Sequence, residues 1–300
     1  MVTCVEPKRP YDFRQMLQRP LSRPSKGMVI NREDYSLTKA VRLASKVLPV
    51  TVSAVDQADG AILRYEYPDG LTPDEREVLN ARIEHMFSTS VDLGGFYAVM
   101  LNNPRWSGII RRFYGVRPLH DDNLFECLIK VIVGQQMTVR FASALIGRLV
   151  DLVGDTVVWQ GARIPVFPSP EQVAVLSHEQ LTSLSFSRRK AEYVIDTARR
   201  IVEGRLDLDA LWAMSDEMVI DQLTVLRGIG RWTAECFLLF GMGRKDVMPA
   251  ADIGVQNGIQ LLFNRTVRPG EAEIRELAQD WRPWRSYATY YLWQSLIDFA

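Results

Sequence analysis

Residues 223–237 read Leu223-Thr-Val-Leu-Arg-Gly-Ile-Gly-Arg-Trp-Thr-Ala-Glu-Cys-Phe237, two helical segments separated by glycines. We expect one helix to end at Leu226, the chain to turn through Gly228 and Gly230, and a second helix to begin at Arg231. Backbone N–H groups then point outward at a helix start, and glycine leaves no Cβ atom in the way of an anion. The hairpin therefore predicts a phosphate site. The alternative is that Gly228 only ends a helix and Gly230 only lets two helices pack closely.

One carboxylate follows this hairpin at a fixed distance. A loop that ends Met248-Pro-Ala-Ala-Asp252 brings Asp252 to the start of a new helix, twenty residues after Trp232. Aspartate is a favoured helix N-cap, and capping is the ordinary role of such a residue. The two roles are compatible, because a cap holds the carboxylate in one orientation. A fixed anion beside a phosphate-binding hairpin can stabilise positive charge on a nucleotide sugar.

Helical periodicity dominates the chain from about Val91 onward, and we predict that this part is all-helical. Asp122 is the expected cap of one helix, and the proline-rich stretch Trp159–Pro170 is an expected loop. Short connections between helices favour a compact orthogonal bundle. The helices expected on either side of the hairpin cover residues 170–176, 178–184, 187–203, 215–223, 231–240 and 252–263.

The N-terminal part shows strand patterns instead. Alternating apolar residues predict strands at Met28–Tyr35, Leu48–Val55 and Ala61–Tyr67, with a tight turn at Asp59-Gly60. Thr72-Pro-Asp-Glu has the form of a helix start and predicts a helix that runs to about Phe87.

These patterns together predict an α+β protein. A mixed α/β domain with a small antiparallel sheet covers residues 1–92, and a helical domain covers residues 93–300. The helical domain is expected to form two lobes, residues 122–245 with the hairpin and residues 93–121 plus 246–300.

The composition is that of a globular chain. Of 300 residues, 47% are hydrophobic and 24% are charged, and no apolar run approaches the roughly 20 residues that span a bilayer. No membrane protein is expected, and the N-terminus shows no secretory signal, so we expect a cytoplasmic location. The cysteines and histidines are far apart in the sequence, which excludes a disulfide framework and matches the ligand spacing of no zinc or iron–sulfur site. They are Cys4, Cys127, Cys236, His85, His120 and His178.

The charges are unevenly divided. Residues 1–120 hold 17 lysines and arginines against 13 acids, whereas residues 121–300 hold 19 against 23. A broadly basic nucleic-acid-binding face is therefore not predicted. Binding to DNA would depend on a few local cations and on oriented backbone groups.

Three motifs in order resemble the helix-hairpin-helix superfamily of DNA glycosylases, and within it the bacterial 3-methyladenine DNA glycosylase II branch. They are the hairpin, the loop that ends at Asp252, and Trp281-Arg-Pro-Trp-Arg-Ser-Tyr-Ala288. Weaker similarity covers Phe125–Val139 and Ser187–Tyr193 and reaches Pro10-Tyr-Asp-Phe13 near the N-terminus. The resemblance covers most of the chain and implies a helix-hairpin-helix glycosylase fold with the extra α/β domain of this branch.

The resemblance also assigns roles to residues. It makes Asp252 the catalytic carboxylate, which stabilises the oxocarbenium-like sugar and assists the attack of water. It implies that no cofactor is required. DNA-binding residues by the same resemblance are Gly228, Gly230, Arg231, Thr233 and Gln136. Backbone carbonyls that match a monovalent or divalent cation site are those of Thr224, Leu226 and Ile229.

The hairpin tryptophan is informative about the reaction. Relatives that also cut the strand carry a Schiff-base lysine at the position of Trp232, and an indole cannot form an imine. We therefore expect a monofunctional enzyme without AP lyase activity. Trp232 and Trp284 match the family's aromatic pocket, which Gln135 and Cys236 also line. A methylated purine is cationic, so an aromatic face attracts it by roughly 0.5–2 kcal/mol. The alternative for either tryptophan is ordinary core packing.

Eversion of a base requires a residue that fills the gap, and the family's wedge position is Gln136. The alternative for Gln135 and Gln136 is an exposed turn between helices. The sequence departs from the family at Cys236, where a relative type has an aromatic residue, at Ala251, which replaces an acid, and at Ser185, where glycine is usual. These departures leave Asp252 in place and predict a wider pocket.

The resemblance therefore predicts a monofunctional DNA glycosylase that removes bases of the 3-methyladenine and 7-methylguanine type from double-stranded DNA in base excision repair. Two alternatives remain open: a glycosylase for an oxidised or deaminated base, and a non-catalytic helix-hairpin-helix DNA-binding protein. The expected partner is double-stranded DNA that contains damaged bases. We expect a monomer that acts on the nucleoid in the bacterial cytoplasm.

Overall fold

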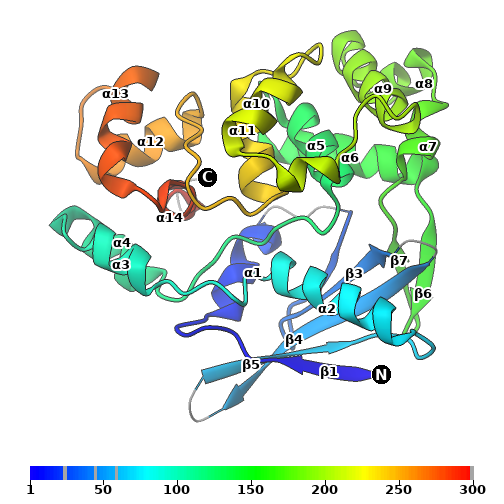
Figure 1. Ribbon diagram of the computed structural model, residues 1–300, viewed down its shortest axis with the longest axis horizontal. Coiled ribbons are helices and arrows are strands. Elements are labelled where there is room, and N and C mark those ends of the chain that lie inside the picture. The colour runs from blue at the N-terminus through cyan, green and yellow to red at the C-terminus, as the bar shows by residue number, and fades with distance from the viewer. Residues whose placement is uncertain (23–25, 44–45, 58–59, 298–300) are drawn as a thin grey trace.

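The computed structural model describes residues 1–22, 26–43, 46–57 and 60–297, and shows a sheet domain beneath a larger helical part (Figure 1). The predicted α+β architecture is confirmed. An antiparallel sheet has the strand order β1-β5-β4-β3-β2. Its strands are β1 Val2–Val5, β2 Val29–Asn31, β3 Ser36–Arg42, β4 Val47–Gln57 and β5 Gly60–Glu66. Within the described ranges, no helix is both long enough and apolar enough to cross a membrane.

Two helices, α1 Phe13–Ser22 and α2 Pro73–Met86, share a hydrophobic core with this sheet. The predicted start of α2 is confirmed. The Thr72 hydroxyl accepts the Glu75 N–H at 3.2 Å, and the Glu75 carboxylate accepts the Thr72 N–H at 2.8 Å. This reciprocal capping box fixes the N-terminus of the helix.

The strand predictions were partly wrong. Strand β2 covers only part of the stretch predicted at Met28–Tyr35, and β1 and β3 were not predicted. The reason for missing β3 is that neighbouring residues along it, such as Ala40 and Val41, are both buried, so no alternation is visible. Of the predicted turn at Asp59-Gly60, residues 58 and 59 lie outside the described part, and Gln57 pairs with Gly60 across strands β4 and β5.

The helical part contains two hydrophobic cores. Its elements are α3 Gly94–Met100, η1 Pro104–Trp106, α4 Ser107–Arg112, α5 Leu124–Gly134, α6 Val139–Val153, α7 Pro170–Ala174, α8 His178–Ser183, α9 Arg188–Val202, η2 Ala210–Ala213, α10 Asp216–Thr224, α11 Arg231–Phe240, α12 Ile253–Leu262, α13 Glu271–Leu277, η3 Ala278–Trp281 and α14 Arg285–Ser295. Helices α5, α6 and α9 to α11 contribute to one core, and α3, α4, α12, α13 and α14 contribute to the other. Phe240, at the end of α11, packs against both cores.

The prediction of an all-helical second part was wrong at one place. Strands β6 Thr156–Trp159 and β7 Ala162–Pro165 form a hairpin that begins before the expected loop Trp159–Pro170 and extends into it. Ile164 and the following Val166 pack against Ala40 of β3, and the Trp159 indole N–H donates to the Thr51 hydroxyl at 3.0 Å. Contact with strands β3 and β4 therefore stabilises the β6–β7 hairpin. Local periodicity in the sequence does not reveal this contact.

A buried cluster of charges joins the sheet domain to α5. The Lys39 ammonium of β3 lies 2.9 Å from Asp122 Oδ1 and 2.8 Å from Glu126 Oε2. Lys130 lies 2.6 Å from both Glu126 Oε1 and Asp121 Oδ1. Burial raises the pKa of the Glu126 carboxyl, but the two ammonium groups outweigh it and hold that pKa at about 2.

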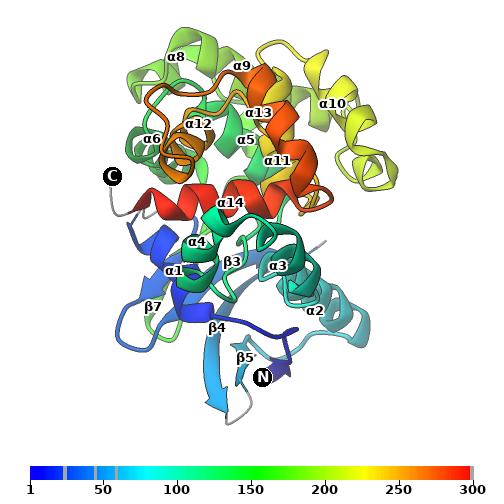
Figure 2. The ribbon, with the colours of Figure 1, turned by 90° about the vertical axis from the view of Figure 1, so that its left-hand side faces the viewer.

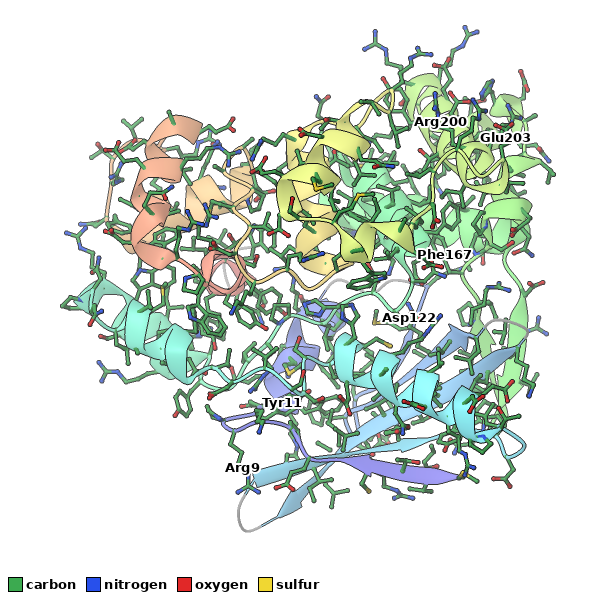
Figure 3. The ribbon with its side chains drawn as sticks, in the orientation of Figure 1. Arg9, Tyr11, Asp122, Phe167, Arg200 and Glu203 are labelled. Carbon is green, nitrogen blue, oxygen red and sulfur yellow. The ribbon has the colours of Figure 1, made fainter. Side chains whose placement is uncertain are left out.

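The prediction that Asp122 caps α5 was therefore wrong. Asn123 is the N-cap, and its side-chain oxygen accepts the N–H groups of Phe125 and Glu126 at 2.8 and 3.1 Å. Figure 3 shows Asp122 at the junction between the helical part and the sheet domain. Aspartate and asparagine are both good caps, and the two roles differ because Asp122 pairs with Lys39 at 2.9 Å and with Arg82 at 3.9 Å.

Candidate active site

Asp252 is the N-cap of α12, as the sequence predicted. Its Oδ1 accepts the Val255 backbone N–H at 2.9 Å, and its own N–H donates to the Pro249 carbonyl at 2.9 Å. The residue is half-buried. The cap therefore fixes the orientation of a carboxylate that solvent still reaches.

Two indoles from different helices hold the two oxygens of this carboxylate. Trp232 Nε1 of α11 donates to Asp252 Oδ2 at 3.1 Å, and Trp293 Nε1 of α14 donates to Asp252 Oδ1 at 2.8 Å. All three donors to the carboxylate are neutral N–H groups, and no described lysine or arginine forms an ion pair with it. The carboxylate is therefore oriented without losing its negative charge to a cation.

Gly254 is required by the close approach of these groups. A Cβ atom at this position would lie 2.9 Å from Asp252 Oδ1 and 2.9 Å from Trp293 Nε1. Any larger residue would push the indole away from the carboxylate.

The C-terminal motif secures the loop that carries Asp252. Arg285 donates to the Asp246 carboxylate and carbonyl, with the Nε–Oδ1 distance at 2.7 Å. The Ser286 hydroxyl accepts the Val247 N–H at 2.9 Å and donates to the Arg244 carbonyl at 2.6 Å. Helix α14 therefore supplies both an indole to the carboxylate and anchors to its loop.

Figure 2 shows α14 lying between α1 and the helices that carry the site. The Trp293 ring stacks on Phe240 with centroids 5.4 Å apart and an interplanar angle of 9°. The Arg19 guanidinium of α1 lies 5.3 Å from the Trp293 ring. Phe240 packs against both cores of the helical part, so the carboxylate lies where the two cores meet.

Trp284 lies in a different setting from Trp232. It is half-buried at the start of α14, packs edge-on against Tyr287 at 5.5 Å, and carries the Lys245 ammonium 5.1 Å from its ring. Within the described ranges it forms no hydrogen bond with Asp252 and no ring contact with Trp232. The second indole at the carboxylate is Trp293, so the role predicted for Trp284 in the base pocket stays a prediction.

The predicted hairpin forms between α10 and α11, although α10 ends at Thr224 rather than at Leu226. Gly228 has φ +87°, and a Cβ atom there would lie 2.3 Å from the Tyr193 ring. Gly230 is the N-cap of α11 without a side-chain cap, and a Cβ atom there would meet nothing within 4 Å. The first N–H groups of α11 are therefore presented at an open surface, which is the arrangement that binds a phosphate.

Arg231 begins α11 but is already paired. Its Nε lies 3.0 Å from Glu235 Oε1, and its terminal nitrogen lies 2.8 Å from Glu217 Oε1. Glu235 is buried, and burial raises the pKa of its carboxyl despite the two arginines beside it, Arg275 and Arg231. A phosphate at Arg231 would therefore compete with the exposed Glu217.

The predicted wedge lies next to the hairpin. Gln135 Nε2 donates to the Gly228 carbonyl at 2.8 Å and to the Thr233 hydroxyl at 2.9 Å. Gln136 is exposed and has φ +54°, a conformation that few residues other than glycine adopt. The two residues thus differ: Gln135 ties the turn to the hairpin, whereas Gln136 forms its projecting tip.

The proposed cation ligands lie on the same hairpin. Carbonyl oxygens are suitable ligands for a hard cation, and the Leu226 carbonyl already accepts the Ile229 N–H at 3.1 Å. Within the described ranges, no group of three or more histidine, cysteine, aspartate or glutamate side chains could hold a metal ion. The cation at Thr224, Leu226 and Ile229 stays a prediction.

The three departures from the family pattern have physical consequences. Cys236 is buried, and burial together with the Asp252 and Glu235 carboxylates raises the pKa of its thiol well above the ordinary value. The thiol is therefore neutral and no nucleophile. Ala251 is exposed beside the cap, and Ser185 has φ +73°, a conformation in which glycine is usual.

Trp293 is the site residue that sequence reasoning missed. It is 41 residues from Asp252, in a helix rich in aromatic residues that supplies no spacing signal. Only the packing of α14 against α12 brings its N–H to the carboxylate.

The chain is similar to known DNA repair proteins. A model of the HhH-GPD superfamily base excision DNA repair proteins matches residues 129–283. A DNA-3-methyladenine glycosylase of Bacillus subtilis is 30% identical over 92% of this chain and 91% of that protein. The Bacillus subtilis protein YfjP is 39% identical over 63% of this chain, and the match spans 65% of its length.

A solved structure shares the fold over nearly the whole chain. The 3-methyladenine DNA-glycosylase from Archaeoglobus fulgidus superposes with a TM-score of 0.86, covers 99% of this chain and 98% of that chain, and is 24% identical. The sheet domain and the helical part of this chain therefore share one known fold. The chain belongs to the HhH-GPD superfamily of base excision DNA repair proteins.

Proposed function

We propose that the chain is a monofunctional DNA glycosylase that hydrolyses the N-glycosidic bond of alkylated purines in double-stranded DNA. The observation that carries the proposal is the Asp252 carboxylate, held by two indole N–H groups and left uncompensated by any described cation. The names of similar proteins support the substrate class.

The proposed reaction balances without a cofactor. The bond from C1′ to the base nitrogen breaks, and its electron pair leaves with the cationic methylated purine, which departs as a neutral base. The positive charge that develops on the sugar faces the Asp252 carboxylate, whose charge stabilises it. Water then attacks C1′, and its proton passes to Asp252 or to solvent. Because the leaving group is already cationic, no general acid is needed to protonate it.

The absence of lyase chemistry is part of the proposal. Strand cleavage by a β-elimination requires an amine that forms an imine with C1′. The hairpin position that would supply it holds Trp232, whose N–H donates to Asp252 at 3.1 Å. An indole nitrogen with its lone pair in the ring cannot replace lysine.

The test is a base-release assay on duplex DNA treated with a methylating agent. We expect free 3-methyladenine and 7-methylguanine, intact strands, and no covalent adduct after borohydride reduction. Oligonucleotides with one oxidised or deaminated base provide the matched comparison. Release of only the oxidised or deaminated bases would contradict the proposed preference for alkylated purines. A borohydride-trapped adduct would contradict the monofunctional mechanism.

A further inference from the structure

Lys190 on α9 makes a set of contacts that the proposed reaction does not use. Its ammonium donates to the carbonyls of Ile132 at 3.2 Å, Val133 at 2.7 Å and Gln135 at 2.7 Å. Ile132 and Val133 lie in the last turn of α5, where a helix leaves carbonyls without intrahelical partners, and Gln135 is the C-cap, whose N–H donates to the Ile132 carbonyl at 3.4 Å. The lysine thus binds the C-terminus of α5 immediately before the predicted wedge tip.

The tip itself is strained and exposed. Gln136 has φ +54° and projects into solvent, one residue after the last carbonyl that Lys190 holds. A non-glycine residue in this conformation costs free energy and persists only where its surroundings determine the backbone. On one side the tip is fixed by Gln135, which donates to the Gly228 carbonyl and the Thr233 hydroxyl.

Helix α9 supports the hairpin on the same face. Tyr193, one turn after Lys190, lies against Gly228, where a Cβ atom would be 2.3 Å from its ring. Glu192 lies 3.1 Å from Arg227, the residue before Gly228. One helical turn of α9 therefore contacts both the base of the wedge and the turn of the hairpin.

We infer that Lys190 is a positioning residue for base eversion, which locks the Gln136 tip to the phosphate-binding hairpin so that both engage DNA as one rigid unit. The inference rests on the proposed function. Eversion costs a few kcal/mol for a paired base and less for an unpaired one. A Gln136 tip that is free to relax loses part of the contact with DNA that offsets this cost. Loss of Lys190 therefore slows release of a paired base more than release of an unpaired one.

The experiment compares Lys190→Met with Lys190→Arg and Arg199→Met. Arg199 is the matched control, because it lies on the same helix and donates to the Ala174 and Leu176 carbonyls, at 3.0 and 3.4 Å, away from the wedge. Release of 7-methylguanine is measured from a duplex with the base paired to cytosine and from one with the base in a one-nucleotide bulge. A second readout is the fluorescence of 2-aminopurine beside a tetrahydrofuran abasic site, which rises when the wedge unstacks it.

We expect Lys190→Met to slow release from the paired duplex about tenfold, to slow release from the bulge less than threefold, and to lose at least half of the fluorescence rise. Lys190→Arg should restore paired release to within threefold, and Arg199→Met should change neither readout. Combined with Gln136→Ala, Lys190→Met should add no further loss. Equal losses on both substrates, or an unchanged fluorescence rise, would overturn the inference.

Two arrangements keep the experiment decisive. Thermal unfolding checks that each variant is folded, and Lys190→Gln, which keeps one short donor, replaces Lys190→Met if that variant does not fold. The fluorescence readout requires no base release. A wild-type protein that unstacks 2-aminopurine but releases no base therefore contradicts the proposed function and leaves the test of Lys190 intact.

Discussion

Two carboxylates of this protein are each held by two side-chain donors, but the donors are of opposite kinds. Asp252 receives the N–H groups of Trp232 and Trp293, which carry no charge. Glu126 receives the ammonium groups of Lys39 and Lys130, which do. The indole N–H groups orient the Asp252 carboxylate and leave its negative charge unpaired. The ammonium groups orient the Glu126 carboxylate and neutralise its charge.

The difference separates the proposed catalytic group, Asp252, from a structural one, Glu126. A carboxylate buried without compensation is costly, so Glu126, almost wholly inside the protein, requires its two cations. Asp252 is half-buried and remains partly solvated, so neutral donors are sufficient. A developing sugar cation would then provide the opposite charge that Asp252 lacks.

The strongest test of this contrast is Asp252→Asn. Asparagine can keep the cap at Val255, but it removes the negative charge and places an NH₂ group opposite the Trp232 N–H. We expect base release to fall by at least ~10⁴-fold, about 5.5 kcal/mol in the activation barrier. Single-turnover release from methylated duplex DNA measures it, with affinity for abasic DNA retained within a few-fold. Comparable release by the variant and the wild type would remove the catalytic role of the charge.

Lys39→Met removes one of the two cations beside Glu126. We expect it to lower the free energy of unfolding and to leave the rate of base release unchanged. It leaves Asp122 and Glu126 buried with one cation fewer, and breaking a buried pair in this way costs about 3–5 kcal/mol. Denaturant unfolding of the two proteins measures the free energy, and single-turnover release at a temperature where both are folded should agree within threefold. A loss below ~1 kcal/mol would show that the cluster is solvated.

The pH dependence of stability follows from the same pair. The pKa of Glu126 is held at about 2, below its ordinary value near 4.5, so its pairing stabilises the fold above pH 4.5. This contribution is lost as the pH falls from 4.5 through 2, with a slope of up to about 1.4 kcal/mol per pH unit. Glu126→Gln should flatten that slope in unfolding measurements across this window. The same slope in both proteins would assign the acid sensitivity to other groups.

The smallest expected effect is that of one neutral donor. Trp293→Phe keeps the stacking on Phe240 but removes the N–H that lies 2.8 Å from Asp252. We expect kcat to fall about tenfold, about 1.4 kcal/mol, with little change in KM. Trp212→Phe, on an exposed tryptophan, is the control. An unchanged kcat would mean that the Val255 cap alone orients the carboxylate.

Prediction from sequence worked best where the signal was local. The hairpin glycines, the helix start at Thr72 and the Asp252 cap all depend on residues within a few positions of one another, and the structure shows each of them. The prediction that Asp122 caps α5 was wrong because Asp122 and Asn123 are equally good caps. The distant Lys39 pairs with Asp122 and leaves Asn123 as the cap.

The larger errors have a common cause. Strand β3 packs against the β6–β7 hairpin, more than a hundred residues away in the sequence, so neighbouring residues of β3 are both buried and it lacks the alternation of a one-sided sheet. Lys190 resembles any helix-surface lysine until α5 lies beside it. Contacts between elements far apart in the sequence produce no periodic pattern of residues.

The amino-acid sequence alone determined the hairpin, the position of a capped carboxylate after it, and the absence of a lysine at Trp232, because these follow from backbone conformation and side-chain chemistry at short range. Tertiary structure decided which second indole meets that carboxylate, which side chain holds the backbone beside the predicted wedge, and which acids are paired with cations. Those outcomes depend on the packing of α14 on α12, of α9 on α5, and of β3 on α5. Hydrogen bonds and ion pairs act only over a few ångströms, so partners far apart in the chain are known only once the fold brings them together.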